Sequence, residues 1–204
     1  KLTVLTALPA GVGLSVLAEP ILLLLYPAVP DTARAAAYHL TFLGLACVFV
    51  CLMVAANGVL QAYGHPLVPV LALLCGGVLK VVTNYLMVGD PATGIRGAAV
   101  STLYCYALIV LIDLIAIARL VPERPGYIRL FARPVLVTTV MALAARSGYG
   151  LFCRVLPERW AVLPAITVAA AVYGILALAT GAVTRRDVVT LPRGEKIADF
   201  LHLR

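Results

Sequence analysis

The stretch that decides the fold is Ala55 to Met87, AANGVLQAYGHPLVPVLALLCGGVLKVVTNYLM, in which one short turn separates two apolar runs. Gly64-His65-Pro66 predicts that turn, because glycine tolerates unusual backbone angles and proline moves the residue before it out of the helical region. Each flanking run reaches the roughly 20 apolar residues that a helix needs to cross a hydrocarbon core about 30 Å thick. The stretch therefore predicts two transmembrane helices joined as a tight hairpin.

The composition of the whole chain agrees with this interpretation. Of its 204 residues, 63% are hydrophobic and 12% are charged, whereas ordinary globular domains are about half apolar and a quarter charged. We therefore expect an all-α, polytopic transmembrane helix bundle. The net charge of +7 does not predict a nucleic-acid partner, because the basic residues lie between apolar runs and in the tail, where anionic lipid attracts them.

Apolar runs separated by turn residues predict about six spans within residues 1–183. A polar tail follows over residues 184–204, and the first residue is Lys1 rather than Met, so we expect a piece of a longer protein. Pro20 is expected to bend or loosen the first span beside Glu19. The predicted spans are 3–26, 35–62, 66–88, 97–118, 134–152 and 161–183.

Two segments between the fourth and sixth spans need separate comment. The segment from Arg119 to Arg133 is polar, and its prolines predict the longest internal loop. The fifth span reaches bilayer length only by including Arg146 and running to about Phe152.

The distribution of Lys and Arg predicts the orientation, because positive charges near helix ends stay preferentially in the cytoplasm. Six spans place ten basic residues on one side and five on the other. We therefore expect a multi-pass membrane protein with both ends in the cytoplasm. The larger set is Lys1, Arg119, Arg124, Arg129, Arg133, Arg185, Arg186, Arg193, Lys196 and Arg204, and the smaller is Arg34, Arg96, Arg146, Arg154 and Arg159.

The sequence lacks the common catalytic patterns. It has no HExxH, no glycine-rich phosphate loop after a strand and no Ser/His/Asp set. Cys47 and Cys51 share a helix face, but no histidine or carboxylate joins them, so neither a metal site nor a cofactor is expected. Polar residues buried among membrane helices instead favour a pathway or cavity for a polar substrate. A transporter is therefore expected rather than an enzyme.

Several segments, in this order, resemble the C-terminal half of the polysaccharide biosynthesis or stage V sporulation protein B group. That group belongs to the multidrug/oligosaccharidyl-lipid/polysaccharide exporter superfamily. The segments are LPAGVGLSVLAEPILLLLYP, NGVLQAYGHPLVPV, GGVLKVVTNYLMV, TGIRGAAVSTLYCYALIVLIDL and TGAVTRRDVVTLPRGEKIADFL.

The resemblance implies a flippase of lipid-linked oligosaccharide or peptidoglycan precursor in the bacterial inner membrane. It would work by alternating access between two helical lobes, and this chain matches the last six of about fourteen spans. The expected partners are that substrate, membrane lipid and the first lobe of the same protein. Two alternatives stay open: a multidrug or cation antiporter of the same fold, and a noncatalytic membrane scaffold subunit of cell-wall assembly.

Lys80 is the first candidate site residue. An ionisable group at membrane depth costs roughly 2.5 to 3.5 kcal/mol on insertion scales, so its presence needs a reason. The functional interpretation is a cavity cation for the substrate diphosphate, with Asn84 one turn on along the same face. The alternative interpretations are a structural ion pair and a snorkelling lysine.

The other candidates are Asn57, Gln61, Glu19 and Asp113. Asn57 and Gln61 could line the cavity, but interhelical hydrogen bonds are the favoured interpretation. For Asp113, an interfacial pair with a nearby arginine and a proton-coupling role stay open. Counting 1.5 Å per residue from the outer helix ends puts Glu19 and Lys80 at similar depth, which predicts that they pair.

The charge bias generates a topology prediction. In a cysteine-free form of the full-length protein, a cysteine placed at Gly126 should react with a membrane-impermeant maleimide only after the cytoplasmic face is opened. Labelling of intact cells at this position would contradict the six-span arrangement.

Overall fold

The computed structural model describes residues 1–91, 93–122 and 127–181. Within these ranges the chain is entirely α-helical with connecting turns, which confirms the expected polytopic helix bundle. Five helices, α3 to α7, are long and apolar enough to cross a membrane, and α1 with α2 make a sixth span if the bent pair counts as one. The helices are α1 (Leu2–Val16), α2 (Ala18–Leu25), α3 (Pro30–Ala62), α4 (Leu67–Val88), α5 (Arg96–Leu120), α6 (Tyr127–Phe152) and α7 (Val162–Ala179).

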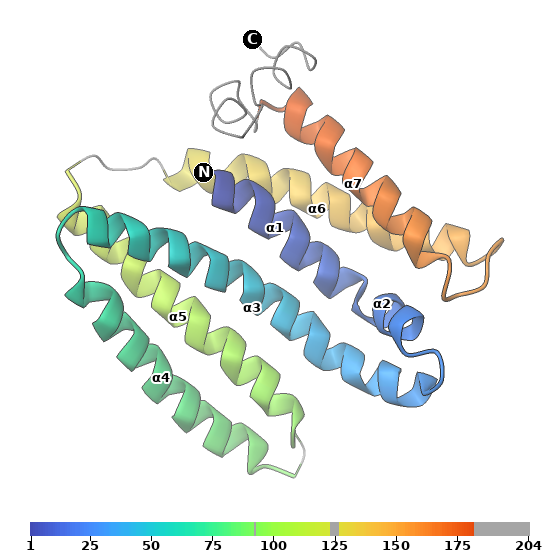
Figure 1. Ribbon diagram of the computed structural model, residues 1–204, viewed down its shortest axis with the longest axis horizontal. Coiled ribbons are helices and arrows are strands. Elements are labelled where there is room, and N and C mark those ends of the chain that lie inside the picture. The colour runs from blue at the N-terminus through green and yellow to red at the C-terminus, as the bar shows by residue number, and fades with distance from the viewer. Residues whose placement is uncertain (92, 123–126, 182–204) are drawn as a thin grey trace.

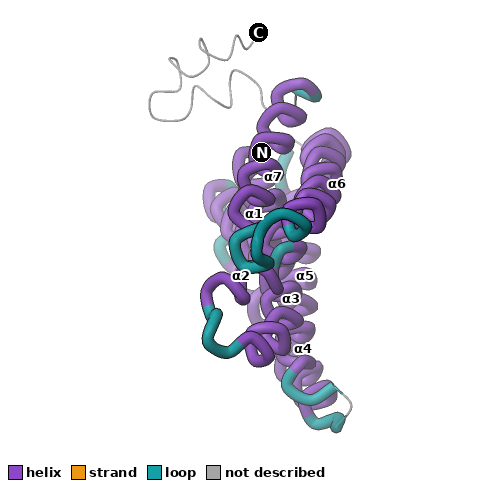
Figure 2. Tube along the Cα trace, turned by 90° about the vertical axis from the view of Figure 1, so that its right-hand side faces the viewer, coloured by secondary structure: helices purple, strands orange, loops and turns teal. Residues whose placement is uncertain are grey.

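The helices lie side by side in the order α4, α5, α3, α1, α6 and α7 (Figure 1). The turned view in Figure 2 shows that this row is thin compared with its width. A row of this kind leaves both broad faces of most helices uncovered. Many large apolar side chains of α4 are therefore exposed, including Leu74, Val78, Val81 and Leu86, as expected where lipid or further helices cover them.

The first apolar segment breaks into two helices at Leu17, and α1 and α2 are bent by 71°. Pro20, the third residue of α2, has no N–H to donate to the carbonyl group of Val16, so the helical hydrogen-bond ladder is interrupted there. Pro9 lies inside α1 without breaking it. The bend predicted beside Glu19 is therefore present, three residues before Pro20.

Small residues hold α1 and α3 together. A Cβ atom added at Gly44 would lie 2.5 Å from Ser15 Oγ and 2.9 Å from the carbonyl oxygen of Gly11, so the two backbones nearly touch. The Ser15 hydroxyl donates to the carbonyl oxygen of Thr41 at 2.8 Å. In return, the Thr41 hydroxyl donates to the carbonyl oxygen of Ser15 at 3.3 Å. Close packing of small residues with interhelical hydrogen bonds is how membrane helices associate without a hydrophobic driving force.

The turn between α3 and α4 forms where the sequence predicts it, with Gly64 at φ 80°. The two helices, however, meet only near this turn, because α4 packs along α5 instead. A Cβ atom at Gly76 of α4 would lie 2.4 Å from Ile109 Cγ1 of α5, which shows how closely these helices approach. The expected tight hairpin is therefore a turn that leads α4 to a different neighbour.

The loop predicted from Arg119 to Arg133 is wrong in its extent. Helix α5 continues to Leu120 and α6 begins at Tyr127, so Pro134 lies inside a helix. A proline within a helix removes one backbone hydrogen bond, and this loss does not end α6. Pro122 does fall after the end of α5, and Pro125 lies outside the described residues. The predicted tail, residues 184–204, lies outside the described residues.

The α1 and α3 contact generates a stability prediction. Gly44→Ala in the full-length protein should lower the thermal midpoint in detergent, because overpacking against a backbone costs about 1 to 3 kcal/mol. Gly58→Ala is the matched control on the same helix, since nothing lies within 4 Å of its added Cβ atom. Equal midpoints for the two variants would contradict the close approach.

Candidate functional site

Asp113 is the most deeply buried ionisable residue in the described part of the chain. It lies on α5 with 0% of its surface exposed. With the Asn57 amide turned so that its nitrogen faces the acceptors, that nitrogen donates to Asp113 Oδ2 at 3.1 Å and to the Met53 carbonyl oxygen at 3.2 Å. Asp113 Oδ1 has no hydrogen-bond partner among the described residues.

This pair is an unusual arrangement for a carboxylate. A buried ionised group is stable only when it is paired and hydrogen-bonded, and a neutral amide supplies one hydrogen bond but no countercharge. The arginine pair that was one of two open alternatives for Asp113 is not among the ion pairs of the described residues. The site can accept a proton or a cation on the unpartnered oxygen.

Asn57 forms the interhelical hydrogen bond that its sequence position predicts, and α5 supplies the acceptor. Gln61 does not. Its side chain is exposed near the end of α3 and makes no hydrogen bond within the described ranges, so the interhelical bond predicted for it is wrong. Gln61 is the second-last residue of α3, and at this helix end its side chain is exposed.

A pocket of about 410 Å³ lies between α1, α3, α5 and α6, close to the buried pair. Ala56 and Leu114, which are the chain neighbours of Asn57 and Asp113, line it. Its other lining residues are mainly apolar, with Lys1, Thr3 and Tyr63 as the polar members.

A second polar group lies between α4 and α5. The fully buried Ser101 hydroxyl of α5 donates to Asn84 Oδ1 of α4 at 3.0 Å. The half-buried Lys80 lies one turn earlier on α4. No carboxylate of the described residues forms an ion pair with Lys80.

The structure does not bring all four cavity candidates together. Asp113, which holds Asn57, and Ser101, which holds Asn84, are twelve residues apart on α5, so the two groups are about 18 Å apart along that helix. The candidates therefore form two polar groups, one with Asn57 and Asp113 and one with Lys80 and Asn84.

The predicted pair of Glu19 with Lys80 is wrong. Glu19 lies on α2 and pairs with Arg34 of α3, with 3.6 Å between Oε1 and Nε. Lys80 lies on α4, on the far side of α5 in the row of helices. Sequence counting gave a similar depth for the two residues, but depth does not specify which helices are neighbours.

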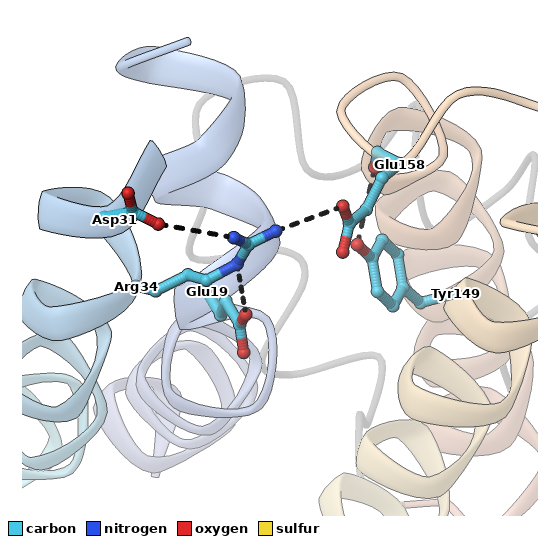
Figure 3. A network of polar contacts seen from close by, with 5 residues as sticks. All are labelled: Glu19, Asp31, Arg34, Tyr149 and Glu158. Carbon is cyan, nitrogen blue, oxygen red and sulfur yellow. Dashed lines mark hydrogen bonds and ion pairs between the residues drawn. The ribbon is translucent and has the colours of Figure 1, made fainter. Parts of the chain in front are cut away.

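Sequence reasoning used Arg34 only as a charge for orientation and missed its contacts. Besides Glu19, Arg34 pairs with Asp31 and with Glu158 in the connection between α6 and α7 (Figure 3). The spacing of Asp31 and Arg34 at a helix start was a local signal, since residues three apart share a helix face. Nothing in the sequence pointed to Glu158.

The buried pair generates a prediction. Asn57→Leu removes the donor to Asp113 and should destabilise the full-length protein by about 1 to 3 kcal/mol, the cost of leaving a buried acceptor unsatisfied. Gln61→Leu is the control, because that side chain is exposed one turn away. Thermal melting in detergent measures both, and equal effects would argue against the hydrogen bond.

Comparison with known proteins supports a coarse assignment. Residues 1–86 match the MatE family, which lies in the exporter superfamily named above. The chain is 25% identical over 209 residues to the uncharacterized membrane protein YabM of Bacillus subtilis (strain 168), covering 100% of this chain and 38% of that protein. No solved structure matches. The chain thus contains a segment similar to a family of membrane transporters, and it spans well under half the length of the relative that it matches.

Proposed function

We propose that this chain is part of a flippase that moves a lipid-linked saccharide or cell-wall precursor across the bacterial inner membrane by alternating access. The observation that supports it most is Lys80, a half-buried cation in a membrane-spanning helix that no described carboxylate neutralises. Such a charge is costly and is usually functional. A substrate with a diphosphate linkage would supply the missing negative charge.

Asn84 strengthens this proposal because its orientation is defined. Its side-chain oxygen accepts the hydrogen bond from Ser101, so the two N–H groups of the amide stay available as donors. Asn84 also lines an open hollow of about 670 Å³ near the end of α4. Together, the ammonium group of Lys80 and the two amide N–H groups of Asn84 offer several donors, which suit the oxygens of an anionic group.

Transport would need more than this chain. The relative has additional sequence, and a cavity with alternating access requires a second set of helices opposite these. Membrane lipid and that further lobe are the partners of this proposal, and the exposed faces of the helix row are where they would pack.

A multidrug or cation antiporter of the same fold is the second candidate, and Asp113 favours it. A fully buried carboxylate with one unpartnered oxygen is a suitable site for a coupling proton or cation. The pocket close to the pair would give such an ion a route to it.

Lys80→Gln in the full-length protein should lower flippase activity at least about tenfold while leaving expression near normal, because the amide keeps much of the volume and loses the charge. Complementation of a flippase-deficient bacterial strain measures this. Lys80→Arg is the matched control, since it retains the positive charge and should retain part of the activity.

The same strains separate the two candidates. Full complementation by Lys80→Gln would argue against a substrate role for Lys80. If Asp113→Asn abolished ion-coupled drug efflux while Lys80→Gln left that efflux intact, the antiporter would replace the flippase as the proposal.

A further inference from the structure

The Arg34 guanidinium joins parts of the chain that are far apart in sequence. Its three nitrogens each meet a different carboxylate: Nε lies 3.6 Å from Glu19, Nη1 lies 3.8 Å from Asp31 and Nη2 lies 3.6 Å from Glu158. Figure 3 shows the guanidinium between the three acidic side chains. We call Glu19, Asp31, Arg34 and Glu158 the Arg34 cluster.

The cluster connects two packing units. Helices α3, α4 and α5 form one unit, with α1 and α2 packed on α3, and α6 with α7 forms the other. The second unit is held mainly by α6 against α1. Helix α7 touches α1 and α2 more narrowly, and there the Tyr173 hydroxyl donates to the carbonyl oxygen of Leu5 at 2.6 Å. The contact of Arg34 with Glu158 is the ion pair that crosses between the units in the described part of the chain.

Glu158 is itself fixed to the second unit. The Tyr149 hydroxyl of α6 donates to the carbonyl oxygen of Glu158 at 3.4 Å (Figure 3). A force on the Glu158 side chain is therefore transmitted to α6. Arg34, on the other side, is fixed at the first turn of α3.

The ion pairs are of the kind that opens easily. The four side chains are 48% to 99% exposed, and exposed ion pairs contribute little to stability. The three carboxylates outnumber the one guanidinium. When Glu158 leaves, Arg34 keeps Glu19 and Asp31 as partners, and Glu158 is left half-exposed to water rather than buried without a countercharge.

Apolar side chains pack across the boundary between the units, where Leu17 shares a buried core cluster with Met141, Ala145 and Ala169. A largely apolar pocket of about 380 Å³ lies between α1, α6 and α7, and Leu17 and Ile21 line it from the break between α1 and α2. Glu19 lies between these two residues in the chain. Two residues that line the pocket therefore lie within two positions of Glu19, a member of the Arg34 cluster.

We propose that the Arg34 cluster is a latch that holds the α6 and α7 unit against the bent α1 and α2 segment, and that release of Glu158 from Arg34 opens the pocket between them. Glu158 is the part of the latch that moves away, whereas Glu19 and Asp31 keep Arg34 in place. The latch acts whatever the transported substrate is.

Spin labels at Thr32 and Val155 test the latch, because both positions are exposed and lie on opposite sides of it. The full-length protein, with its other cysteines replaced, is reconstituted in lipid nanodiscs and the distance distribution is measured by double electron–electron resonance. Glu158→Gln should raise the fraction of long distances about two- to fivefold, the effect of losing one exposed ion pair, and Arg34→Gln should do the same.

Asp31→Asn is the matched control. It removes a carboxylate from the same guanidinium, but that contact lies within α3, so the distances should stay as in the wild type. Raising the salt to about 1 M, where the screening length falls to about 3 Å, should lengthen the wild-type distances and leave those of Glu158→Gln unchanged.

The latch is rejected if Glu158→Gln gives the wild-type distribution at both salt concentrations, or if Asp31→Asn lengthens the distances as much as Glu158→Gln does. Should Arg34→Gln fail to fold, Glu158→Gln decides alone, because its side chain is half-exposed in a connection between helices. The measurement needs no substrate, so a failure of the latch and a failure of the proposed flippase are distinguishable.

Discussion

Every backbone N–H and C=O group inside a bilayer has to find its hydrogen-bond partner within the protein, and a helix satisfies nearly all of them locally. Because of this constraint the described chain is a set of helices. The helices then associate through a few close contacts between neighbours. Gly11 and Gly44 allow α1 to touch α3, and Gly76 allows α4 to touch α5. Around these contacts the remaining side chains are largely apolar and face outward.

Buried polar groups follow the same helix contacts. Asn57 and Asp113 join α3 to α5, Asn84 and Ser101 join α4 to α5, and Ser15 with Thr41 joins α1 to α3. Such bonds add specificity to helix pairs that apolar packing alone would leave free to slide. The first leaves Asp113 Oδ1 without a partner among the described residues. The second uses the side-chain oxygen of the half-buried Asn84, and these two residues support the functional proposals.

The break at Leu17 bends the first apolar segment of the row into two helices, α1 and α2. Because Pro20 interrupts the helical ladder, α2 turns away from α1 and brings Glu19 to the start of α3. A pocket between α1, α6 and α7 lies beside the same bend, where Leu17 and Ile21 line it. A proline in the sequence thus places a carboxylate beside Arg34, and the proposed latch uses this carboxylate.

The sequence by itself determined the elements that depend on local or compositional physics. Long apolar runs predicted the helices, Gly64 and Pro66 predicted the turn after α3, and Pro20 predicted the bend, because each of these effects acts over a few residues. The start of α6 was missed, since a proline can begin a helix or lie inside one with the same backbone angles.

Tertiary structure alone decided which helices are neighbours and which charged side chains pair. Counting along spans gave the depth of Glu19 and Lys80. The pairing of Glu19 with Arg34 and the packing of α4 on α5, however, depend on which helices are neighbours. Close contacts between residues far apart in the chain, such as Gly11 with Gly44 and Gly76 with Ile109, decide this.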